Sequence, residues 1–132
     1  MIRMKTTDIG RLGEISVARL LKKQGFKILE RNIHVSHNEI DIIALNKRCK
    51  IVAFVEVKAR SVDKDMYSRF GTPAAAVTKE KQRRTIDAAK GYLRANPKLY
   101  EFGVRFDVAE VYLDKEDLSV MKINYIENAF GV

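Results

Sequence analysis

Four charged residues interrupt two apolar stretches in the middle of the chain. Glu39 and Asp41 alternate with isoleucines, and Glu56 and Lys58 follow an apolar run. Side chains alternate across a strand, so Glu39 shares a face with Asp41, and Glu56 shares a face with Lys58. Carboxylate oxygens are the ligands that Mg²⁺ prefers, and a nearby lysine can stabilise the charge that develops on a phosphate. This set of residues therefore indicates phosphodiester hydrolysis.

The loop between the two stretches predicts how they pair. A hairpin closed by about four residues, at 47–50, places Asp41 opposite Glu56 and Glu39 opposite Lys58, with facing Cβ atoms ~5 Å apart. Two carboxylates so close either share a cation, or one of them keeps a proton. A register slip of one residue would move Asp41 to the other face. The alternative interpretation is an ordinary surface ion pair between Glu39 and Lys58.

The elements that must position these residues follow from periodicity. Two amphipathic stretches predict helices, and stretches rich in β-branched residues and phenylalanine predict five strands, the first three as an antiparallel meander. Asp107 stands inside one of these strands and is expected to be a hydrogen-bonded structural acid. A polar loop is predicted at 61–72. The predicted order, αβββαββ, has a helix at 6–24, strands at 26–35, 38–45 and 50–59, a helix at 79–95 capped by Thr78, and strands at 104–113 and 120–126.

Length, composition and charge narrow the class of protein. With 132 residues, 46% of them hydrophobic, the chain is expected to form one domain over 1–132 with a single core. No stretch resembles a membrane helix or a signal peptide, and Cys49 is the only cysteine, which predicts a cytoplasmic protein without disulfides. The net charge of +8 favours a nucleic-acid partner over a membrane or an acidic protein.

Basic residues on the second predicted helix are candidates for contacting a phosphate backbone. The alternative is a solvated helix face. In the loop at 61–72, Tyr67 and Phe70 alternate with basic residues and are able to stack on unpaired bases, although packing against the domain edge is an equal alternative. The predicted nucleic-acid contacts are Arg11, Arg60, Lys79, Lys81, Gln82, Arg83 and Arg84.

Several ordered motifs make the sequence similar to a known family. They are GRLGE at 10–14, GFKILERN at 25–32, EIDII at 39–43, FVEVKAR at 54–60 and RFD at 105–107. In this order and spacing they resemble the YraN-like proteins of bacteria. That family is similar to the restriction-endonuclease-like superfamily, which includes the archaeal Holliday junction resolvases. The resemblance implies an α/β fold, a restriction-endonuclease-like mixed β-sheet flanked by helices.

The resemblance also implies roles for individual residues. The superfamily motif falls on Asp41 and Glu56 as metal ligands and on Lys58 as a catalytic residue, with Glu14 of the first helix as a further acidic ligand. Glu14 lies one turn from Arg11 and is able to lean over the sheet edge, while its alternative roles are a solvated acid or a partner of Arg11. Glu39 is expected to support the ligands. Mg²⁺ is the expected metal, with Mn²⁺ as a substitute.

The expected function is that of a Mg²⁺-dependent nuclease that hydrolyses phosphodiester bonds of DNA, including branched or single-stranded structures. One alternative is a module of the same fold that binds nucleic acid and cleaves nothing. Another is a basic adaptor in which the carboxylates form a structural network. A junction substrate would favour a two-fold homodimer.

Overall fold

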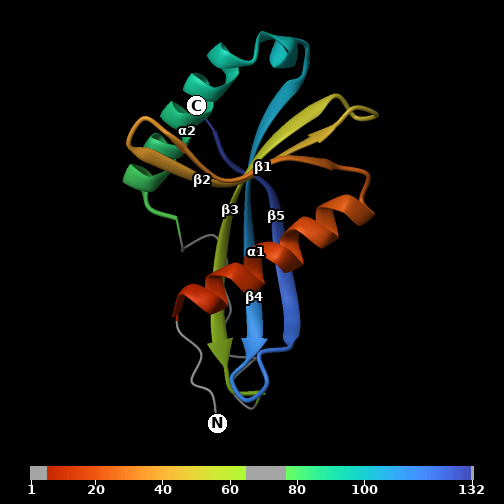
Figure 1. Cartoon of the computed structure of the whole chain (residues 1–132), viewed down its shortest axis with the longest axis vertical. Helices are drawn as coiled ribbons and strands as arrows, with labels where there is room; N and C mark the ends of the chain where they lie inside the picture. The colour runs from red at the N-terminus through yellow and green to blue at the C-terminus, as the bar shows by residue number, and fades with distance from the viewer. Residues whose placement is uncertain (1–5, 65–76, 132) are drawn as a thin grey trace.

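A mixed five-stranded sheet with a helix on each face forms the body of the chain in this computed structural model (Figure 1). The structure describes residues 6–64 and 77–131. The predicted α/β class and the order αβββαββ are confirmed, with one short 3-10 helix added before β4. The elements are α1 (Thr6–Lys23), β1 (Lys27–Val35), β2 (Asn38–Asn46), β3 (Ile51–Val62), α2 (Lys79–Ala95), η3 (Pro97–Glu101), β4 (Gly103–Asp114) and β5 (Val120–Phe130).

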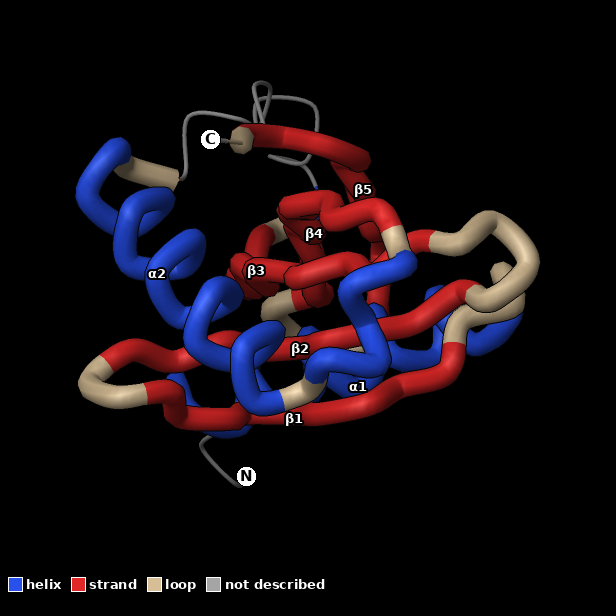
Figure 2. The backbone as a smooth tube through the Cα atoms, turned by 90° about the horizontal axis from the view of Figure 1, so that it is seen from above, coloured by secondary structure: helices blue, strands red, loops and turns tan. Residues whose placement is uncertain are grey.

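The strands follow one another across the sheet in sequence order, from β1 to β5 (Figure 2). The first three form the predicted antiparallel meander, β3 and β4 are parallel, and β5 pairs antiparallel with β4. A parallel pair needs a crossover connection, and α2 lies within the segment that links β3 to β4. The β1–β2 hairpin runs at a steep angle across the three longer strands, β3, β4 and β5 (Figure 1).

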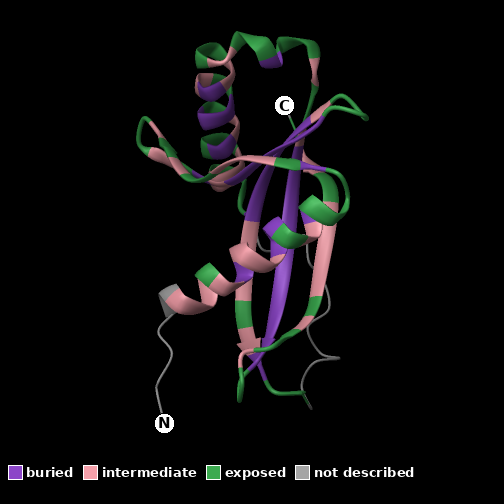
Figure 3. Cartoon of the chain, turned by 45° about the vertical axis from the view of Figure 1, so that its right-hand side comes forward, coloured by how far each residue is buried: buried purple, intermediate pink, exposed green. Residues whose placement is uncertain are grey.

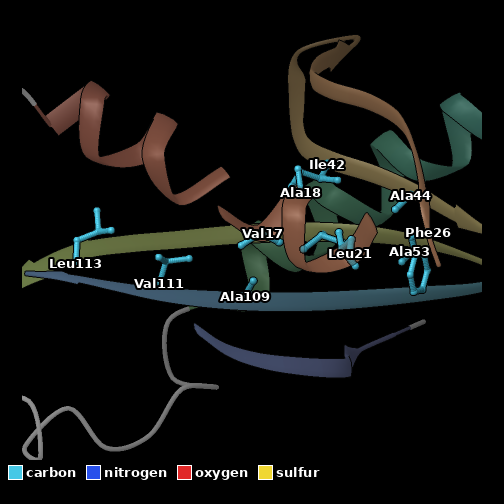
Figure 4. Packing of buried hydrophobic residues seen from close by; sticks show 11 residues of the cluster. Val17, Ala18, Leu21, Phe26, Ile42, Ala44, Ala53, Ala109, Val111 and Leu113 are labelled. Carbon is cyan, nitrogen blue, oxygen red and sulfur yellow. The ribbon is translucent and has the colours of Figure 1, made fainter. Parts of the chain in front are cut away.

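The face under α1 holds one of the two apolar clusters. Val17, Ala18 and Leu21 of α1 are buried against alanines and valines of β3 and β4 (Figure 4). Gly13 allows the close approach of the helix, because a Cβ atom added there would lie 2.6 Å from the Cβ of Ala59 on β3. Small residues on both elements therefore set the position of α1 over the sheet.

The opposite face is covered by α2. Ala88, Ala89 and Tyr92 of this helix pack on Phe54, which stacks against Phe106 of β4 with ring centroids 5.6 Å apart. The predicted N-cap is confirmed, since the side chain of Thr78 accepts a hydrogen bond from the amide of Lys81. β4 is buried along most of its length, and β3 is buried mainly over residues 52–56 (Figure 3).

Asp107 ties β4 to β5. Its side chain is fully buried and accepts hydrogen bonds from the guanidinium of Arg105 at 2.9 Å, the hydroxyl of Tyr125 at 2.6 Å and the amide of Asn128 at 2.9 Å. These donors satisfy both carboxylate oxygens, so the prediction of a structural acid is confirmed.

The predicted loop begins later than the sequence indicates. Residues 61 and 62 extend β3, because they pair with Leu113 and Asp114 of β4. Neither Tyr67 nor Phe70 lies within the described residues. In the parts of the chain that are described, no helix combines the length and apolarity needed to cross a bilayer.

Candidate functional site

The predicted register of the β2–β3 hairpin is confirmed from its turn as far as Ile42. Asn46 pairs with Ile51 across a turn at 47–50, and the ladder runs to the pair Ile42 and Val55. Beyond this pair, the contact between the two strands is made by the side chain of Asp41. Its Oδ2 accepts a hydrogen bond from the amide of Val57 at 2.8 Å. Asp41 is therefore fixed at the point where β2 leaves β3.

Glu56 is the buried centre of the site. Its side chain is only 7% exposed, although it carries a carboxylate. The Nζ atom of Lys58 lies 3.6 Å from one oxygen of Glu56, and the Nζ atom of Lys81 lies 3.8 Å from the other. The two lysines remain partly accessible, with 38% and 31% of their side chains exposed. The Glu56 carboxylate is thus buried, while the two lysines beside it remain accessible to solvent.

The two carboxyl groups perturb each other. Burial, followed by the charge of Asp41, raises the pKa of Glu56 to about 7, although Lys81 and Lys58 act in the opposite direction. Burial also raises the pKa of Asp41, against the lowering effects of the Val57 hydrogen bond and the Lys81 charge. The two acids lie together as the sequence predicts, and their proximity makes the charged pair costly without a compensating cation.

The position of Lys81 comes from the start of α2. The sequence predicts this residue as a contact to a phosphate backbone, without a link to the carboxylates. In the structure, its ammonium reaches Glu56 from the first turn of a helix whose start is fixed by the Thr78 cap. A lysine 25 positions beyond Glu56 in the sequence carries no local signal of this contact.

The predicted pairing of Glu39 with Lys58 is wrong. The β2–β3 ladder ends at the pair Ile42 and Val55, before it reaches Glu39, which pairs with His34 of β1 on the other side of β2. The His34 Nε2 atom lies 4.0 Å from the Glu39 carboxylate, and both side chains are largely exposed. The reason is the course of the β1–β2 hairpin, which runs across the long strands (Figure 1). The charge of Glu39 still raises the pKa of Asp41.

Glu14 approaches the site from α1. The close contact of Gly13 with β3 brings this turn of the helix down onto the sheet. Burial raises the pKa of Glu14, a hydrogen bond with the Asn32 side chain lowers it, and the charge of Asp41 raises it again. Asn32 was missed by the sequence analysis, and it adopts a positive φ of 52° within β1. Its only sequence signal is that asparagine tolerates this conformation better than most residues.

The three predicted ligands are not gathered into a ready-made metal site. Among residues 6–64 and 77–131, no three His, Cys, Asp or Glu side chains are arranged to hold an ion. Asp41 and Glu56 form the close pair, whereas Glu14 is held by Asn32.

The predicted nucleic-acid contacts on α2, apart from Lys81, differ in exposure. Lys79, Arg83 and Arg84 are exposed, and Arg84 forms an ion pair with the carboxylate one turn earlier. Gln82 is half-buried, and its side-chain amide donates a hydrogen bond to the carbonyl of Val77. Gln82 thus has a structural role at the helix start, and its role in nucleic-acid binding stays a prediction.

Arg11 lies on α1 and Arg60 on β3. Arg11 is exposed and lines a cavity of about 330 Å³ together with Gly10, Glu14 and Asn32. Arg60 is exposed on β3, two residues beyond Lys58 and therefore on the same face of the strand.

Two solved structures align with most of this chain. A repair endonuclease from Pyrococcus abyssi aligns over 87% of this chain and 42% of its own, with a TM-score of 0.41 and 17% identity. SfsA from Pyrococcus furiosus, solved in complex with Ca²⁺, aligns over 92% of this chain and 65% of its own, with a TM-score of 0.41 and 14% identity. The chain thus spans less than two thirds of either protein.

Relatives of similar length are much closer in sequence. A UPF0102 protein of Clostridium perfringens is 44% identical over 125 residues, which cover 95% of each chain. A UPF0102 protein of Caldanaerobacter subterraneus is 39% identical over 130 residues, which cover 98% of this chain and all of the relative. Residues 13–111 match the family described as "Uncharacterised protein family UPF0102". The resemblance to YraN-like proteins is thereby confirmed, and the chain belongs to the UPF0102 family.

Proposed function

We propose that this protein is a divalent-metal-dependent nuclease that hydrolyses phosphodiester bonds of DNA. The observation that carries the proposal is the pair of Asp41 and Glu56, two carboxyl groups brought together in a largely buried position between accessible lysines. Placing like charges together away from water is destabilising, so such a pair is typical of a functional site.

The donor set fits a hard divalent cation. Asp41 has one oxygen committed to the amide of Val57, which leaves its other oxygen as a candidate ligand. The oxygens of Glu56 lie 3.6 and 3.8 Å from lysine ammonium groups, distances longer than a strong charged hydrogen bond, and its carboxyl group also meets that of Asp41. Mg²⁺ retains several waters and requires few protein carboxylates, so Asp41 and Glu56 suffice as its direct protein ligands. When bound, Mg²⁺ or Mn²⁺ would supply an activated water and polarise the phosphate.

We assign roles to the other residues of the site from where they lie. Lys58 lies beside Glu56 and remains accessible, so we assign it to the scissile phosphate, where its ammonium stabilises the charge of the transition state. Glu14 is assigned to a water of the metal, and Glu39 supports the site through its charge on Asp41. The exposed arginines and lysines of α2, with Arg11 and Arg60, would bind the DNA backbone.

The experiment is a cleavage assay on end-labelled DNA. Single-stranded, duplex and four-way-junction substrates are incubated with the protein in Mg²⁺, Mn²⁺ or EDTA, beside Glu56→Gln and Lys58→Ala. Metal-dependent cleavage by the wild type that is lost in both variants supports the proposal. A preference for the junction would support a two-fold homodimer, to be checked by sedimentation. The matched control is Glu116→Gln, since Glu116 is an exposed acid in the β4–β5 turn, and this variant should cleave like the wild type.

The alternative is a nucleic-acid-binding module that does not cleave. One observation favours it: both oxygens of Glu56 already face a lysine, so the charge of this carboxylate is compensated within the protein. In that case the wild type and Glu56→Gln bind DNA equally and neither cleaves it under any metal condition. DNA binding that falls steeply with salt would exclude the adaptor role, whereas no binding at low salt would exclude both nucleic-acid roles.

A further inference from the structure

Glu110 is a buried acid that the proposed site does not use. It lies on β4 and is only 4% exposed. Its Oε2 atom accepts a hydrogen bond from the hydroxyl of Tyr112 at 3.1 Å. Its Oε1 atom is buried and has no hydrogen-bond partner among the described residues. A buried carboxylate oxygen without a donor is destabilising, so its presence needs an explanation.

The register of the parallel pair brings Glu110 beside Lys58. These two residues are direct partners in the β3–β4 ladder. They share the face opposite α1, because their neighbours Val57 and Ala109 both belong to the cluster under α1. Lys58 is therefore flanked by two acids on the same face, Glu56 along its own strand and Glu110 on the adjacent strand.

Lys58 has hydrogen-bond donors, and Glu110 has an acceptor oxygen without a donor. The Lys58 ammonium has three N–H donors, and in the structure it makes its ion pair with Glu56 at 3.6 Å. A divalent cation on Glu56 would compete with this ammonium for the same carboxylate and repel it. The Oε1 atom of Glu110 is a buried acceptor on the strand next to Lys58. Lys81 reaches Glu56 from α2 and is not a ladder partner of Glu110.

We propose that Glu110 is a second acceptor for Lys58, which receives its ammonium when a divalent cation occupies Glu56. The Oε1 atom of Glu110 then keeps Lys58 on the sheet beside the metal, where it would otherwise extend into solvent. Glu110 is a positioning residue, since it acts through Lys58. The inference rests on the proposed metal-binding function.

The test measures how accessible the Lys58 amine is. Wild type, Glu110→Gln and the exposed control Glu116→Gln are acetylated briefly with and without Mg²⁺, and mass spectrometry quantifies each lysine relative to exposed Lys98. In the wild type and the control, Mg²⁺ should leave the acetylation of Lys58 nearly unchanged. In Glu110→Gln, Mg²⁺ should raise it about tenfold, the factor expected for loss of a charge-assisted hydrogen bond. Calorimetry with Mg²⁺ establishes in parallel whether each protein binds the metal.

The two hypotheses fail in different ways. If calorimetry shows Mg²⁺ binding and Lys58 responds equally in wild type and Glu110→Gln, the role of Glu110 is refuted and the proposed function stands. If the wild type binds no Mg²⁺, both are refuted. Should Glu110→Gln fail to fold, a crystal structure of the wild type with Mn²⁺ decides. Lys58 hydrogen-bonded to Glu110 supports the inference, and Lys58 on Glu56 or in solvent contradicts it.

Discussion

Replacing Glu56 by glutamine should stabilise the protein above pH 7, although the residue belongs to the proposed site. The buried carboxyl group of the wild type has its pKa raised to about 7 by burial and by the charge of Asp41. The folded protein therefore holds this proton to a higher pH than the unfolded chain does. The stability of the wild type falls as the pH rises from about 4.5 to about 7.

The size of the effect follows from the two pKa values. A rise from 4.5 to about 7 corresponds to about 3 kcal/mol of unfolding free energy lost by the wild type above pH 7. Because glutamine is neutral, the unfolding free energy of the variant should not fall by this amount above pH 7. The interactions of Glu56 with Lys58 and Lys81 are already included in the pKa of about 7. The raised pKa of Asp41 acts in the same direction in both proteins, and the charge of Asp41 is already among the causes of the Glu56 shift.

The assay is urea unfolding in EDTA at about pH 4 and about pH 8, on either side of the transition. At the higher pH, Glu56→Gln should exceed the wild type by up to about 3 kcal/mol, or roughly 10 °C in Tm. At the lower pH the two should be nearly equal. Glu116→Gln, in an exposed turn, should match the wild type at both. Equal stabilities of Glu56→Gln and wild type at both pH values would show that the buried charge carries no such penalty.

Three further substitutions test the packing that positions the site, each by chemical denaturation. Gly13→Ala should cost about 1 to 3 kcal/mol because its Cβ would lie 2.6 Å from that of Ala59, whereas Gly10→Ala, with nothing within 4 Å, should gain up to about 1 kcal/mol. Equal effects at the two glycines would contradict the close approach of α1. Asp107→Asn should cost about 3 kcal/mol, since it leaves the half-buried guanidinium of Arg105 with only the more exposed Glu127 as a charged partner; a loss below about 1 kcal/mol would contradict this role. Thr78→Ala should cost about 1 kcal/mol through loss of the N-cap, and Thr78→Ser should restore most of it.

Local patterns in the sequence were sufficient to predict the helices and strands, and to predict that Asp41 and Glu56 lie close together. The alternation of Asp41 and Glu56 with apolar residues, together with a turn at 47–50, predicted a register that the structure confirms as far as Ile42. The Thr78 cap and the structural role of Asp107 also follow from local chemistry. Each of these predictions depends on residues close in sequence or on a single strand.

The contacts that sequence reasoning missed depend on how distant elements approach one another. Glu39 was placed opposite Lys58 because a straight ladder was assumed, whereas the ladder ends where β2 turns away from β3. The reach of Lys81 to Glu56 depends on where α2 packs on the sheet. The bond between Asn32 and Glu14 depends on the positive φ of Asn32 and on the height of α1 over the sheet. Periodicity contains no information about these distances.

The mixed topology also determines when the site assembles during folding. Asp41 and Glu56 lie on strands joined by a short turn, so they meet early, while the pair is still in contact with water. Lys81 arrives later, when α2 packs and the chain returns to form the parallel β3–β4 pair. Burial of the acids accompanies this late step. With a final pKa of about 7 for Glu56, the docking of α2 should take up part of a proton near neutral pH, and the docked state should become less favourable relative to the undocked hairpin as the solution becomes alkaline.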